Sequence, residues 1–123
     1  MDQNIGFERL SALSKLEELN LDFNDFNESI LPSLVKITSL KILSLRYNKI
    51  TGRVPINKGF TMSKLEELYL TGNYNITDLG FICKIAISLK KLHLSDIAYL
   101  NGGINIQKLG KLKIQELYLD DIE

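Results

Sequence analysis

The hydrophobic positions of this chain follow one pattern that returns every 24 or 25 residues. The pattern is Leu-x-x-Leu-x-Leu, with isoleucine at the first position of its last copy. The five copies begin at Leu16, Leu40, Leu65, Leu89 and Ile114. The last two apolar residues of each copy have a period of two, which places both side chains on one side of a short strand. Because so much chain separates them, these strands cannot form tight hairpins, and we expect them to stack in parallel.

Apolar residues also recur between the predicted strands, three positions apart, as in Leu31, Leu34, Ile37 and Leu40. We expect these return segments to face inward and to close the core from the other side. One repeat cannot bury its own apolar side, and about three are needed for a continuous core. The predicted fold is therefore an α/β solenoid with a parallel β-sheet on its concave side and irregular or 3₁₀ segments on its convex side.

The motif continues beyond the first three predicted strands with Asn24, Asn48 and Asn73. The whole pattern resembles that of leucine-rich repeats. It predicts a single domain over residues 1–123, apparently truncated at both ends and with open sheet edges. The predicted repeat cores are residues 16–26, 40–50, 65–76, 89–97 and 114–122.

The second repeat carries a more specific signature. Residues 48–55 read Asn-Lys-Ile-Thr-Gly-Arg-Val-Pro, which resembles the extension found in the leucine-rich repeats of plant receptor-like proteins and receptor-like kinases. The resemblance implies a non-catalytic module that recognises a peptide, a protein or a co-receptor ectodomain on the extracellular side of the plasma membrane. It also implies signalling in defence or development.

Three other parent proteins remain open at this stage. The repeats could come from the ectodomain of a receptor-like kinase, or from a cytosolic immune receptor or scaffold. A soluble inhibitor of cell-wall hydrolases uses the same kind of repeat. No signal peptide or transmembrane segment is visible in this sequence, so any membrane attachment would come from other parts of the parent chain.

The asparagine after each strand has a predicted structural role. Backbone groups at the bend point into the core, and an unpaired group costs about 1–3 kcal/mol. A buried amide can both donate and accept there, so we expect Asn24, Asn48 and Asn73 to link successive repeats. The last two repeats have Ile97 and Ile122 at this position, and isoleucine can do neither.

Residues that alternate with the buried leucines should project from the concave side of the sheet. Tyr69, His93 and Tyr118 fall on neighbouring strands and predict a continuous aromatic strip, and tyrosine is enriched at protein interfaces. Arg46, beside Tyr47, could anchor a carboxylate. The predicted ligand-binding residues are Arg46, Tyr47, Tyr69, His93 and Tyr118.

Composition and charge then narrow the possible functions. Fifteen basic and fifteen acidic residues give a formal net charge of zero, which argues against binding to nucleic acid. With one cysteine, Cys83, and one histidine, we predict no metal site, no cofactor and no enzymatic activity. Two glycosylation motifs begin at Asn27 and Asn75, and they favour the secretory route.

Overall fold

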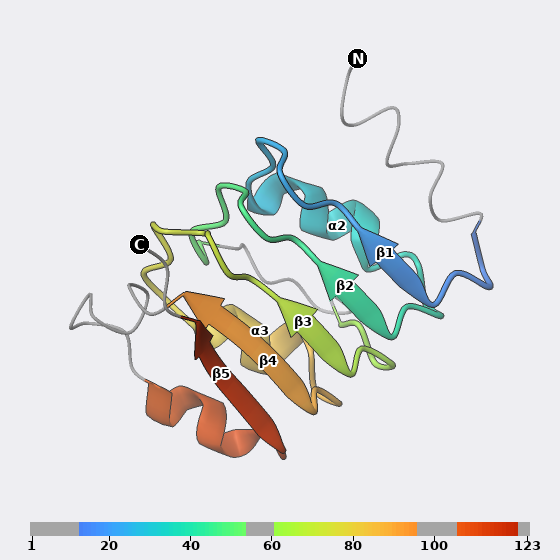
Figure 1. The fold of residues 1–123 in the computed structure, drawn as a ribbon. Coiled ribbons are helices and arrows are strands. Elements are labelled where there is room, and N and C mark those ends of the chain that lie inside the picture. Colours follow the sequence, from blue (N-terminus) through green and yellow to red (C-terminus); the bar gives the residue numbers. More distant parts are fainter. Residues whose placement is uncertain (1–12, 54–60, 96–105, 121–123) are drawn as a thin grey trace.

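The chain folds as a stack of parallel strands with its helices on one side of the sheet (Figure 1). The computed structural model describes residues 13–53, 61–95 and 106–120. One sheet holds the strands in sequence order: β1 (Glu18–Asn20), β2 (Ile42–Ser44), β3 (Glu67–Tyr69), β4 (Lys91–Ser95) and β5 (Glu116–Asp120). The predicted solenoid with a parallel sheet is confirmed.

The register of the sheet follows the repeat. Leu19, Leu43, Leu68, Leu92 and Leu117 are aligned across the five strands. Every strand therefore turns the same face toward the interior, because a slip of one residue would reverse all of its side chains. The predicted alignment of the leucines is correct.

Short helices form the return segments. Figure 1 shows them behind the sheet, except for the last one, which lies beside β5. They are η2 (Glu28–Ile30), α2 (Leu31–Leu34), α3 (Gly80–Ile85) and η3 (Ile106–Lys111). The side chain of Asn27 caps η2 by accepting a hydrogen bond from Ser29 N. Pro32 lies in the first turn of α2, where a residue without an N–H group loses no helical hydrogen bond.

The core lies between the inner face of the sheet and these return segments. Leu43 and Leu92 from the sheet and Leu34 from α2 are fully buried. Leu117 shows that this burial needs a neighbouring repeat on each side, because its side chain in β5, the last strand, is 40% exposed. The interior is therefore shared between repeats and is thinnest at the outermost described strands.

The chain makes the same bend after each of the first three strands. Phe23, Tyr47 and Gly72 occupy this bend, with φ angles of +59°, +57° and +87°. Glycine adopts this left-handed conformation without a steric penalty, whereas an aromatic residue does not. The corresponding bends of the last two repeats, with Ile97 and Ile122, lie outside the described residues.

The Thr-Gly pair of the plant-type signature joins three return segments. Thr51 donates from N and Oγ1 to the Glu28 carboxylate, at 2.9 and 2.6 Å. Its carbonyl oxygen accepts from Thr77 N at 3.0 Å. Gly52 has a φ of +89°, and a Cβ atom there would overlap the carbonyl oxygen of Asp78. The signature therefore packs one repeat against its neighbours. Val54 and Pro55, which complete it, lie outside the described residues.

Candidate functional site: the concave face of the sheet

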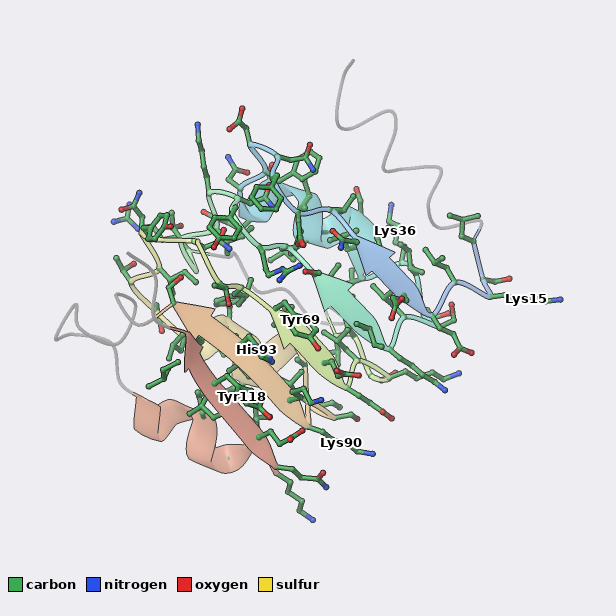
Figure 2. All side chains as sticks on the ribbon, in the orientation of Figure 1. Lys15, Lys36, Tyr69, Lys90, His93 and Tyr118 are labelled. Atoms are coloured by element: carbon green, nitrogen blue, oxygen red, sulfur yellow. The ribbon has the colours of Figure 1, made fainter. Side chains whose placement is uncertain are left out.

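Three aromatic side chains stack across the concave face of the sheet (Figure 2). The ring centroids of Tyr69 and His93 are 4.5 Å apart, and those of His93 and Tyr118 are 4.3 Å apart. The rings are parallel within 25°. Tyr69, His93 and Tyr118 are also aligned in the sheet register. The prediction that they are neighbours is confirmed, and we call them the aromatic strip.

Each tyrosine of the strip is held by a carboxylate two residues earlier on its own strand. The hydroxyl of Tyr69 donates to Glu67 Oε1, and the hydroxyl of Tyr118 donates to Glu116 Oε1, both at 2.9 Å. Lys91 lies between these carboxylates, 3.6 Å from Glu67 Oε1 and 3.3 Å from Glu116 Oε2. The strip is thus fixed by hydrogen bonds and ion pairs across three strands.

The pKa values of these groups follow from their contacts. The hydrogen bond to Glu116 raises the pKa of Tyr118, because losing the proton would break that bond beside a negative charge. Burial and the bond to Glu67 raise the pKa of Tyr69. The hydrogen bonds from Tyr118 and Lys91 lower the pKa of Glu116. These tyrosines are therefore neutral donors near neutral pH.

Arg46 is already occupied by a carboxylate of the chain itself. Its Nε and Nη2 atoms both lie 2.9 Å from Asp22 Oδ2, and its backbone N–H donates to Asp22 Oδ1. Ser44 Oγ also donates to Asp22 Oδ1, at 2.6 Å. Asp22, whose side chain is only 7% exposed, is the residue that the prediction for Arg46 missed. The signal was present in the sequence, since the two occupy equivalent positions in successive repeats.

Tyr47 does not join the aromatic strip. It follows β2 at the left-handed bend, where its ring stacks on Phe23 at 4.7 Å with the planes 7° apart. On its other side the ring packs against Gly72, since a Cβ there would lie 2.5 Å from Cδ1 of Tyr47. Of the five predicted binding residues, the structure brings together Tyr69, His93 and Tyr118 and places Tyr47 in a separate aromatic pair.

The concave face is hollowed beside the strip, above β2. The hollow has a volume of about 460 Å³. Its lining residues come from three adjacent strands and the bend after β2: Glu18, Leu19, Asn20, Ile42, Ser44, Arg46, Glu67 and Tyr69. On β2, Ile42 and Ser44 each have a shorter side chain than the residues aligned with them on β1 and β3. Neither Glu18 nor Glu67 was among the predicted binding residues.

The asparagines after the strands differ along the stack. Asn73 is fully buried; its Oδ1 accepts from Ile50 N, and its Nδ2 donates to Leu45 O and Leu70 O. Asn48 makes the equivalent bonds to Phe26 N, Leu21 O and Arg46 O. Both asparagines thus bond to the preceding repeat.

Asn24 does not link repeats in this way, contrary to the expectation. It is exposed, and its Nδ2 donates to Leu21 O and Asp22 O of its own repeat. The physical reason is that Asn24 follows β1, the first described strand, whereas Asn48 and Asn73 bond to the repeat before them. No described strand precedes β1 in the sheet.

The asparagines of the two glycosylation motifs are exposed, although Ile76 in the second motif is buried. Asn27 is exposed, and its Oδ1 caps η2. Asn75 is also exposed and lines a shallow hollow that includes Tyr74. Neither asparagine belongs to a strand of the sheet.

Comparisons with known proteins agree with this architecture. Leucine-rich repeat family models match residues 15–37, residues 38–84 as two copies, and residues 88–106. The chain belongs to the leucine-rich repeat family. It is 37% identical over 93 residues to Receptor like protein 21 of Arabidopsis thaliana, and 40% identical over 68 residues to Receptor-like protein 9a of the same plant. These leucine-rich repeats are of the plant receptor-like type.

The alignments cover much of this chain but little of the relatives. They span 76% of the chain and 9% of Receptor like protein 21, and 55% of the chain and 7% of Receptor-like protein 9a. No helix among the described residues of the leucine-rich repeat chain is long and apolar enough to cross a membrane. Within the same residues, no group of three or more histidine, cysteine or acidic side chains could hold a metal ion.

Proposed function

We propose that this leucine-rich repeat chain is a recognition module of a plant receptor-like protein. It faces the outside of the plasma membrane and binds a peptide, a protein or a co-receptor ectodomain on its concave sheet, in defence or development signalling. The module works by adhesion rather than by chemistry. Its similarity to Receptor like protein 21 and Receptor-like protein 9a supports the class of parent protein.

The observation that carries the binding role is the aromatic strip. Tyr118 is 40% exposed although it stacks on His93, so its ring presents contact area to solvent. The hydrogen bonds to Glu67 and Glu116 fix the strip before any partner arrives. A surface with ordered aromatic side chains loses little conformational entropy on binding, which suits it to recognition.

The two surface glycosylation motifs support the extracellular side. Asn27 and Asn75 are both exposed and lie outside the strands that form the concave face. Sugar attachment at either position would be tolerated by the fold.

Photo-crosslinking in plant cells tests the binding role. The full receptor would carry a photoreactive amino acid in place of Tyr118 in one version and of Tyr74 in a matched version. Tyr74 is similarly exposed, at 42%, but it lies outside the aromatic strip. We expect a crosslinked partner at position 118 and none at position 74. Equal crosslinking at both positions, or none at position 118, would contradict the proposal.

A further inference from the structure

We propose that the concave face selects a partner segment that carries lysine or arginine. One such side chain enters the hollow above β2, between Glu18 and Glu67 and against the ring of Tyr69. The inference rests on the proposed function, because it assumes that the concave sheet is the binding surface. Beyond the proposed function, the inference specifies that the partner carries a positively charged side chain.

The first argument is the direction of the hydrogen bonds on this face. The hydroxyl protons of Tyr69 and Tyr118 are donated to Glu67 and Glu116. The hydroxyl oxygens can still accept, as can the remaining carboxylate lone pairs. A partner therefore meets acceptors along the strip, and these suit the N–H groups of basic side chains.

The second argument is the charge around the hollow. Glu18 and Glu67 flank Ile42 in the sheet register, so they stand two strand spacings apart, roughly 10 Å. Glu18 is exposed and makes no ion pair with the other described residues. The cation that lines the hollow, Arg46, is paired with Asp22 at 2.9 Å. Glu67 shares the single cation of Lys91 with Glu116. Together with Glu18, these carboxylates leave an excess of negative charge around the hollow.

The third argument is the shape of the hollow and its aromatic wall. One face of the Tyr69 ring stacks on His93 of β4, so the opposite face looks across β2, where Ser44 is small. Ile42 forms an apolar floor below. A lysine or arginine side chain can lay its methylene groups on such a floor and its charge over an aromatic face.

The same features disfavour an acidic partner. A carboxylate in the hollow would lie near Glu18 and Glu67 and would have to compete with Asp22 for Arg46. Asp22 holds that guanidinium through two nitrogens and also accepts from Ser44. The role of carboxylate anchor that the sequence suggested for Arg46 is therefore already filled from within the chain.

The experiment uses the full 123-residue chain and two synthetic peptides. One is an acetylated and amidated Gly-Ser peptide with two arginines, and the other has glutamates in their place. Binding is followed by NMR titration of the backbone amides. We expect the arginine peptide to shift the signals of Ile42, Ser44 and Tyr69 in a saturable way, and the glutamate peptide to leave them unchanged.

Variants assign the effect to the hollow. The double variant Glu18→Gln/Glu67→Gln should weaken binding of the arginine peptide by about fivefold or more, since each removes one ion pair. Tyr69→Leu should weaken it more than Tyr69→Phe, which keeps the ring. Asp25→Asn is the matched control, because Asp25 is exposed, pairs with Lys49 and lies outside the hollow.

Two results would overturn the inference. Binding of the glutamate peptide to the hollow with equal affinity would refute the choice of a basic partner and leave concave recognition standing. Shifts that avoid Ile42, Ser44 and Tyr69 altogether would refute the hollow as the binding position. Crosslinking at position 118 of the full receptor would still decide the proposed function separately.

Discussion

At position 52 the fold has room for glycine only. The φ angle of Gly52 is +89°, and an added Cβ would overlap backbone atoms of Asp78 in the next repeat. A backbone atom cannot rotate away as a side chain can. The glycine of the plant-type signature is therefore required both by its left-handed backbone and by a contact between repeats.

Gly52→Ala should lower the free energy of unfolding by about 2–3 kcal/mol, because it adds backbone strain and a steric overlap. Gly110→Ala is the control, since a Cβ at Gly110 meets no atom within 4 Å. Urea unfolding followed by circular dichroism measures both variants. Equal stability of the two variants would show that the return segments yield to the added methyl group.

Asp22 is a nearly buried carboxylate that accepts hydrogen bonds from Ser44 and Arg46. Burial opposes its charge, but the hydrogen bonds from Ser44 and Arg46 outweigh burial and lower its pKa below the ordinary 3.8. Because its pKa is lower in the folded state, Asp22 stabilises the fold at pH values above 3.8. That contribution disappears as the pH falls through the lowered pKa.

Asp22→Asn should therefore destabilise the chain by about 1–2 kcal/mol at pH 6. The difference between the variant and the wild type should shrink as the pH falls below 3.8 and through the lowered pKa, because the wild-type carboxyl then becomes protonated as well. Denaturant unfolding across this pH range measures the difference, with Asp25→Asn as a solvated control. A difference that stays constant with pH would exclude Asp22 as its source.

At the scale of the elements, the asparagines that follow the strands supply hydrogen-bond partners for backbone groups at the bends. Asn73 satisfies one N–H and two C=O groups of the bends from a fully buried position. Asn24 makes its bonds in solvent and within its own repeat. Asparagine at the same motif position therefore contributes different amounts to the free energy of unfolding in different repeats.

Asn73→Ala should cost about 3 kcal/mol of unfolding free energy, because it leaves buried backbone groups without partners. Asn24→Ala should cost less than about 1 kcal/mol, since water replaces its hydrogen bonds. Chemical denaturation of both variants makes the comparison direct. If Asn24→Ala lowered the free energy of unfolding as much as Asn73→Ala, our explanation that these hydrogen bonds need a preceding repeat would be wrong.

The strands and their register were predictable because a period of two inside a 24- or 25-residue repeat admits few arrangements. The aromatic strip was predictable for the same reason, because the repeat length aligns its three residues on neighbouring strands. The pairing of Arg46 with Asp22 was harder to foresee, since equivalent positions in adjacent repeats can either pair or both face a ligand. The left-handed aromatic bends at Phe23 and Tyr47 also escaped prediction, because bulky residues rarely adopt that conformation.

At the scale of the whole molecule, each repeat depends on its neighbours to bury its leucines and to pair its charged side chains. Leu43 is buried by repeats on both sides, whereas Leu117 is 40% exposed. Arg46 is held by an acid from the repeat before it, and Lys91 bridges the acids on both neighbouring strands. Contacts between repeats thus set both the stability of the stack and the chemistry of its concave face.

The sheet register also bears on how two copies would meet. If β1 of one molecule continued the sheet from β5 of another in the same register, Glu18 would stand directly beside Glu116. Like charges opposite each other on adjacent strands repel. An endless fibre built head to tail from this chain would repeat that repulsion at every junction, so the arrangement of acids disfavours polymerisation.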